Sequence, residues 1–434
     1  MQIIDKTKEV LETEKVNTKR KFLKLIFAVP FWLILAAFVL IGFGIGRAFY
    51  LIDTRPDQKV AEIWQSKSEM SFRHMSVFAG GIRSQGDISP LTYTDGGKSI
   101  HLADIALIRK DLQASTDTGS AAATKNIQYV EGKLRGWEDC YSSTVRASVN
   151  AVEVKDGLEE VIGTADTQLV AVGGNYKAFH PFRYLSGGFL PEVPVDTNHI
   201  VINDVLAWKF YHSYDVLGNR LIINDQMFTI IGVVEERSTK VAELSGEQEN
   251  RAFIYFGTLG TLYHSVTTDE NGEVISTEPA DFAIQCYEAL LPELVNGVAV
   301  TDFKNAMPSY SLTNPQIYVS NNTGRFGVLR ILDTVFPLGE TDRARMGYEF
   351  PYWEKAAQMI EDRLFYDYVL VFADVVLLLI GLVMTGLKFR ARKAVKPDEI
   401  DDDYPDETDD PYQEELTEEE KERRELLKSV THLG

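Results

Sequence analysis

Cysteine is scarce in this chain, where Cys140 and Cys286 are the two examples in 434 residues. So few thiols exclude a disulfide-rich scaffold. Neither cysteine stands in a Cys/His spacing that is typical of zinc, so we expect no metal site. A disulfide between the two can form in an oxidising compartment, and two separate thiols are the alternative.

Positive charge is also in short supply. The chain has 44 Lys and Arg against 64 Asp and Glu, which gives a formal net charge of -20. Nucleic acid is therefore not an expected partner, because phosphate binding requires concentrated Lys and Arg. Residues 398–425 supply much of the acidity, and such a run repels itself. This predicts a solvated tail, or alternatively a docking segment for a basic partner.

Catalytic motifs are missing as well. The sequence has no H-E-x-x-H, no G-x-S-x-G and no Walker lysine loop, so we predict that it is not an enzyme and has no cofactor. His180 and His212 are expected to be structural or surface residues. The run Asp269-Glu270-Asn271-Gly272 lacks the alternating ligands of a calcium loop and indicates a turn.

Two long apolar runs stand out against this background. Leu25 to Ile45 carries no charged residue, and Tyr368 to Leu387 carries only Asp374. About 20 residues at a rise of about 1.5 Å span the roughly 30 Å core of a bilayer. Each run therefore predicts a transmembrane helix.

Basic residues flank both runs on the side that faces away from the long central segment. They are Lys19, Arg20, Lys21 and Lys24 before the first run, and Lys388, Arg390, Arg392, Lys393 and Lys396 after the second. The positive-inside rule places both termini in the cytoplasm. The predicted organisation is a cytoplasmic segment over 1–21, a span over 22–50, an extracytoplasmic domain over 51–365, a span over 366–388 and a cytoplasmic acidic tail over 389–434.

Small and polar residues inside the spans are candidates for helix packing. Gly42 and Gly46 are four residues apart in the first span, and Gly381 and Thr385 have the same spacing in the second. Such spacing lets helix backbones approach closely. Asp374 is costly in a membrane, at about 2.5 to 3.5 kcal/mol if central. It indicates a polar contact with a partner helix or, alternatively, a tolerated charge near the interface.

The segment between the spans mixes helical and strand patterns, which predicts an α+β domain of two lobes. Helices are expected over 103–112, over 204–211 with Asp204 as N-cap, and over 350–365 leading into the second span. Strands are expected over 169–172, 199–202, 220–223, 227–234, 251–256, 281–287 and 316–319. A hairpin turn is expected at Asn224-Asp225-Gln226 and another tight turn at Asn271-Gly272.

Residues 169–234 carry a resemblance to a known family. They hold a "value of G" strand at Val170 to Gly174, then Gly187-Gly188-Phe189 and an I-V-I-N strand at Ile200 to Asn203. A D-x-x-G turn at Asp215 to Gly218 follows, and then a hairpin strand at Phe228 to Val234, where the family pattern ends in V-G-V and this chain reads I-G-V. This order resembles the outer core domain of MacB-like ABC transporter permeases, a family related to FtsX.

The resemblance implies a non-catalytic transmembrane subunit of a MacB-like ABC transport or efflux complex. Its partners would be an ABC ATPase subunit, a further permease or adaptor subunit, and the lipid bilayer. Tyr352, Trp353 and Glu354, in a segment similar to Gram-positive members, would couple the outer domain to the membrane. Family permeases carry three spans after this domain, whereas the sequence has one, so the chain resembles a shortened, two-span member. A membrane-anchored sensor or scaffold with an extracellular ligand-binding domain and a partner-recruiting tail is the alternative.

Overall fold

The computed structural model describes residues 29–66, 71–79, 99–119, 136–155, 158–268, 274–293, 295–313, 317–335 and 350–394. The predicted cytoplasmic segment over 1–21, the tail beyond residue 394 and the turn at Asn271-Gly272 lie outside these residues. The chain divides into two compact units, one of 1–34 with 379–434 and one of 35–378.

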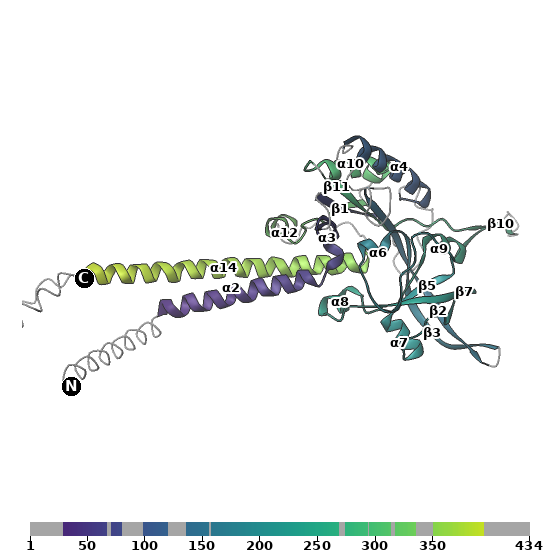
Figure 1. The fold of residues 1–434 in the computed structure, drawn as a ribbon, viewed down its shortest axis with the longest axis horizontal. Helices are drawn as coiled ribbons and strands as arrows, with labels where there is room; N and C mark the ends of the chain where they lie inside the picture. The colour runs from purple at the N-terminus through teal and green to yellow at the C-terminus, as the bar shows by residue number, and fades with distance from the viewer. Residues whose placement is uncertain are drawn as a thin grey trace, which may run out of the picture. The chain divides into compact units, whose positions relative to one another are not determined.

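Two helices are long and apolar enough to cross a membrane, as the sequence predicts (Figure 1). They are α2 (Val29–Asp53) and α14 (Tyr352–Ala394). Within residues 35–378, Gly44 of α2 lies against Val371 of α14, and Arg47 forms a 3.4 Å ion pair with Asp367. The two helices therefore contact each other where they approach the folded domain.

The domain between them is built on one sheet, in the strand order β12-β1-β11-β2-β3-β8-β5-β7-β4, with β6 pairing to β2 and β7. The strands are β1 (Ser71–Ala79), β2 (Glu138–Lys155), β3 (Leu158–Gly174), β4 (Arg183–Gly187), β5 (His199–Asn203), β6 (Arg220–Ile223), β7 (Gln226–Glu235), β8 (Arg251–Tyr255), β11 (Cys286–Glu293) and β12 (Ile317–Asn321). A separate pair joins β9 (His264–Thr268) to β10 (Val274–Pro279). The predicted α+β class is confirmed.

Helices connect the strands. They are η1 (Pro56–Gln58), α3 (Val60–Gln65), α4 (Leu102–Gly119), α6 (Tyr176–Phe179), α7 (Asp204–Tyr211), α8 (Lys240–Ser245), α9 (Phe256–Leu262), α10 (Val298–Ala306), α11 (Ser309–Thr313) and α12 (Val328–Val335). Among them, α3, α6, α7, α9 and α10 contact the sheet. Helices α4 and α10 pack on each other beside β1 and β11 (Figure 1). One apolar core lies under these helices, and a second surrounds Tyr176, Phe253 and Trp353 on the side of α6 and α14.

The glycines of the family-like segment meet each other in the sheet. Gly187 at the end of β4 pairs with Gly232 in the middle of β7. A methyl group on Gly232 would overlap the backbone carbonyl of Gly188, and Gly187 has a φ of 64°. Glycine is required where backbones come this close or adopt positive φ. Gly187-Gly188 and Ile231-Gly232-Val233 therefore form the two sides of one close contact.

Local signals gave accurate hairpin and helix positions, with two corrections. The β6–β7 turn is confirmed, since Asn224 and Asp225 both have positive φ, as a two-residue type I′ turn requires. The N-cap of α7 is Asn203 rather than Asp204. The Asn203 side chain accepts a hydrogen bond from the Leu206 amide at 3.0 Å.

The second correction concerns the strand predicted over 281–287, which instead runs over Cys286–Glu293. The Gln285 side chain explains the shift. Its amide oxygen accepts from the Thr144 N–H at 2.9 Å, and its amide nitrogen donates to the Thr144 carbonyl at 3.1 Å. These side-chain bonds take the place of backbone hydrogen bonds between the strands. Regular pairing with β2 begins only at Cys286.

Candidate functional site: the membrane-proximal junction

Charged side chains gather where α2 ends and α14 begins, within residues 35–378. We call this cluster the junction. It contains Arg55, Asp57, Glu236, Arg237, Glu247, Arg251, Arg325, Glu354 and Glu361, all of which are buried or, for Glu236 and Arg237, partly exposed. Charges are rarely buried unless they are paired, so this concentration marks a specific arrangement.

Arg325, in the loop between β12 and α12, attaches the domain to α14. Its guanidinium forms a bidentate pair with Glu354 at 2.8 and 2.9 Å and a further 2.8 Å bond to Glu361. Glu354 and Glu361 are seven residues apart, which places them on one face of a helix. Gln58, next to α2, accepts another Arg325 N–H at 2.7 Å. One side chain thus connects both membrane helices to the sheet.

A second set of charges connects α2 to the loops beyond β7 and α8. The fully buried Arg55 pairs with Glu247, and Arg237 lies 3.1 Å from Asp57 and 3.4 Å from Glu247. Burial opposes the ionisation of Asp57, but Arg237 and Arg55 outweigh it and hold the pKa of this carboxyl below its ordinary value. The residues that follow α2 are therefore fixed by charge pairs.

Aromatic contacts complete the attachment of the first turn of α14. The guanidinium of Arg251 lies 3.6 Å from the ring centre of Tyr352 and 2.5 Å from Glu236. The Trp353 ring packs against His180, with ring centres 4.5 Å apart. A cavity of about 360 Å³ opens beside these groups, lined by both aromatic residues, His180 and Asp57.

Three of the predicted site residues lie in the junction. Tyr352, Trp353 and Glu354 are all buried in the junction. Gly42 and Gly46 are exposed, and a methyl group on either would meet nothing within 4 Å. Contact of those two glycines with another helix remains a prediction.

Two further predicted residues lie on the membrane part of α14. Asp374 is half-buried. A methyl group on Gly381 would come within 2.8 Å of the Ile34 side chain, so this glycine sits against α2 within the smaller unit. Whether Asp374 contacts a partner helix remains a prediction.

Sequence reasoning missed the partners of Glu354, namely Arg325 and the charges around Glu247. One signal was available. Glu354 and Glu361 both lie on the apolar face of the predicted helix, where a carboxylate would be buried. Buried carboxylates require a cation as partner.

We expect Asp57→Asn to destabilise the domain by about 1 to 3 kcal/mol at pH 7, because Arg237 loses the nearer of its two carboxylate partners. A carboxyl whose folded pKa is lowered contributes stability above its ordinary value of 3.8 and loses it as the pH falls through the folded value. The gap in melting temperature between wild type and Asp57→Asn should therefore shrink between pH 7 and pH 3. Asp53→Asn, at an exposed carboxylate, serves as control. A gap that stays constant would contradict this role.

Comparison with known proteins places these features in a family. No curated protein matches the chain. Among solved structures, the periplasmic region of MacB from Actinobacillus actinomycetemcomitans is 14% identical, with 58% of this chain and 89% of that chain covered and a TM-score of 0.33. The extracellular domain of the noncanonic ABC-type transporter YknZ from Gram-positive bacteria is 13% identical, with 57% and 100% covered and a TM-score of 0.31.

A domain of a putative permease from Porphyromonas gingivalis is also 13% identical, with 58% and 88% covered and a TM-score of 0.27. The model of the MacB-like periplasmic core domain matches residues 86–324. That match takes in most of the sheet, from β2 to β12, together with Arg251 and Glu247 of the junction. Because it covers more than half of the 434 residues, the chain belongs to the family of the MacB-like periplasmic core domain.

Proposed function

We propose that this chain is a non-catalytic transmembrane subunit of a MacB-like ABC transport or efflux complex. An ABC ATPase subunit and a further permease or adaptor subunit are its proposed partners. ATP turnover in the partner moves the membrane helices, and the junction passes that motion to the extracytoplasmic domain. Both termini lie in the cytoplasm in this proposal, which rests on the basic residues outside each span.

The continuity of α14 is the observation that carries the proposal. The helix runs without a break from Tyr352, buried in the domain, to Ala394 beyond the apolar segment. Residues 352–380 contain no proline and no glycine, the usual causes of a kink. A stiff helix that is paired at both Glu354 and Glu361 transmits a shift or tilt to Arg325 without a hinge to absorb it.

The end of α2 supplies a second attachment. Tyr368 of α14 donates a hydrogen bond to the Phe326 carbonyl at 2.8 Å, next to Arg325, while Gln58 after α2 bonds Arg325 itself. Relative movement of the two spans therefore acts on one short loop. This loop follows β12, the edge strand that pairs with β1.

The partners can be tested by purifying the tagged full chain from its native membrane in mild detergent and identifying co-purifying proteins by mass spectrometry. Recovery of a nucleotide-binding subunit supports the proposal. Repeated failure to recover any ATPase or permease, with a cytoplasmic protein bound to the acidic tail instead, would favour the sensor or scaffold.

Stiffness of α14 can be tested in the recovered complex. Tyr366 and Val369 are exposed, so replacing both removes little packing within the chain. Two glycines should weaken the helix by about 1 kcal/mol each relative to two alanines. We expect nucleotide-dependent hydrogen exchange in β1 and β12 to fall at least twofold in the glycine pair and to persist in the alanine pair. Equal exchange in both pairs would contradict transmission through α14.

A further inference from the structure

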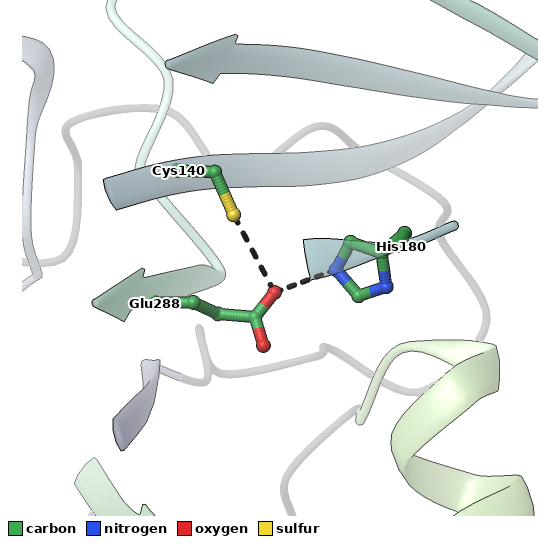
Figure 2. Close-up of side chains that lie close together, drawn as sticks. All are labelled: Cys140, His180 and Glu288. Carbon is green, nitrogen blue, oxygen red and sulfur yellow. Dashed lines mark hydrogen bonds and ion pairs between the residues drawn. The ribbon is translucent and has the colours of Figure 1, made fainter. Parts of the chain in front are cut away.

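A thiol, an imidazole and a carboxylate, which are all groups that can bind a metal ion, lie close together inside the domain. They are on the side of the core that Trp353 covers. Cys140 comes from β2, Glu288 from β11, and His180 directly follows α6 (Figure 2). Their ligand atoms all lie within 4.8 Å of one another, and each residue is at most 4% exposed. The thiol, the imidazole and the carboxylate point toward a common centre (Figure 2).

The carboxylate of Glu288 is the middle of the group. Its Oε2 lies 2.6 Å from His180 Nε2 and 3.6 Å from Cys140 Sγ. Its other oxygen, Oε1, contacts His74 Nε2 and accepts from Ser76 Oγ, each at 3.0 Å. Asn322 in turn donates to Ser76 Oγ at 2.7 Å. One oxygen is thus held in place by an outer ring of polar groups, while the other faces the thiol and His180.

The sequence brings these residues together through strand register. Cys140 stands directly opposite Glu288 in the β2–β11 pair. Positions 140, 180 and 288 are far apart in the chain, so no Cys/His spacing reveals them. The expectation that the chain has no metal site rested on that spacing alone.

The donor set suits zinc. Thiolate, imidazole and carboxylate bind Zn²⁺ at about 2.3, 2.0 and 2.0 Å, which puts neighbouring ligand atoms of a tetrahedron about 3.3 to 3.6 Å apart. Glu288 and Cys140 already have this separation, and Glu288 and His180 need to move apart by less than about 1 Å. The ion would replace the proton shared by Glu288 and His180 and the thiol proton, and its charge would balance the thiolate and the carboxylate.

One of the three side chains also lines a cavity. His180 forms part of the wall of the 360 Å³ cavity beside the junction. Three protein ligands leave a fourth coordination position, which water supplies in open zinc sites. The His180 ring contacts the rings of Tyr176 and Trp353 at tilted angles, with ring-centre distances of 4.3 and 4.5 Å, so its position is restrained.

We propose that Cys140, His180 and Glu288 bind a zinc ion, with His74 and Ser76 orienting the carboxylate. The ion would join β2, β11 and α6 beneath the first turn of α14. It would therefore stabilise the surface on which Trp353 packs. This function is additional to the transport role and does not depend on an ATPase partner.

The test uses the full chain in detergent, stripped of metal with a chelator and titrated with Zn²⁺ and, separately, with Co²⁺. We expect one ion per chain, a rise in melting temperature with Zn²⁺, and the near-ultraviolet absorption of a thiolate–cobalt bond with Co²⁺. Cys140→Ala should abolish this absorption and weaken zinc binding by more than about 100-fold, whereas His74→Gln should weaken it by about tenfold.

Cys286→Ala is the matched control, because Cys286 is an equally buried thiol two residues from Glu288 on the same strand but is not one of the three ligands. It should retain zinc binding and the cobalt absorption. His180→Gln provides a second ligand variant should Cys140→Ala fail to fold. The proposal is overturned if zinc binds with the same affinity in the ligand variants, if no ion binds, or if the unfolded chain yields no free thiol without reductant, since a Cys140–Cys286 disulfide would then occupy the ligand.

Discussion

Replacing Arg325 with alanine should lower the free energy of unfolding of the outer domain by about 3 to 5 kcal/mol, because the buried carboxylates of Glu354 and Glu361 would both lose this guanidinium. Burial opposes protonation of Arg325, but Glu354 and Glu361 outweigh it and raise its pKa well above the usual value. The guanidinium is therefore charged at every pH at which the domain folds. Urea titration of the full chain in detergent, followed by tryptophan fluorescence, measures the loss.

Arg146→Ala is the matched control. Arg146 also contacts two carboxylates, Asp166 and Glu249, each at 3.0 Å, but all three side chains are more than a third exposed. Exposed pairs contribute about 0 to 1 kcal/mol, so this variant should stay close to wild type. Equal losses of unfolding free energy in the two variants would mean that burial of the Arg325 cluster does not increase its contribution to stability.

A triple variant separates charge from packing. Arg325→Ala combined with Glu354→Gln and Glu361→Gln leaves no uncompensated charge in the junction. It should recover part of the stability that Arg325→Ala loses, since most of that loss is the cost of burying two carboxylates whose shared guanidinium is gone. If the triple variant is less stable than the single one, the hydrogen bonds and shape of the carboxylates, rather than their charge, would dominate.

The second large effect is expected at Gly232, which pairs with Gly187 at the end of β4. Gly232→Ala should destabilise the domain by about 1 to 3 kcal/mol or more, because the added methyl group would overlap the Gly188 carbonyl and backbone cannot move aside cheaply. A thermal melt of the full chain in detergent measures the effect.

Gly188→Ala is the control in this case. A methyl group on Gly188 meets nothing within 4 Å, although the residue lies on the other side of the same contact. We expect its melting temperature to stay within a few degrees of wild type. Similar losses in both variants would contradict the close approach of β4 and β7 as the cause, because Gly188 has no such overlap and the entropy effect of Gly→Ala on the unfolded chain is stabilising.

Local chemistry explains what the sequence could predict. The β6–β7 turn, the helix at Asp204–Tyr211 and the two apolar helices each depend on residues that are near neighbours in the chain. The long strand β2 was missed although Val145, Ala147, Val149 and Ala151 alternate correctly and are all buried. Small side chains such as alanine give a weak apolar signal, and serine on the other face gives a weak polar one.

The junction and the group of Cys140, His180 and Glu288 both consist of residues that are far apart in the chain. The sequence therefore predicts only part of the junction and none of the second group. Tyr352, Trp353 and Glu354 were identified through a family resemblance, and their burial in the junction follows from contacts that no local pattern encodes. Arg325 is 29 residues from Glu354, and Glu247 is 192 residues from Arg55. Only the completed sheet brings such pairs together.

The position of β1 in the sheet determines when the domain can fold during synthesis. This is the first strand after α2, yet both of its neighbours, β11 and β12, are made more than 200 residues later. Pairing across such a separation is slow, and an unpaired strand can associate with other chains. In the proposed topology, the sheet can close only after residue 321 has crossed the membrane. Until then β1 requires protection, so this topology ties folding of the domain to the end of its export.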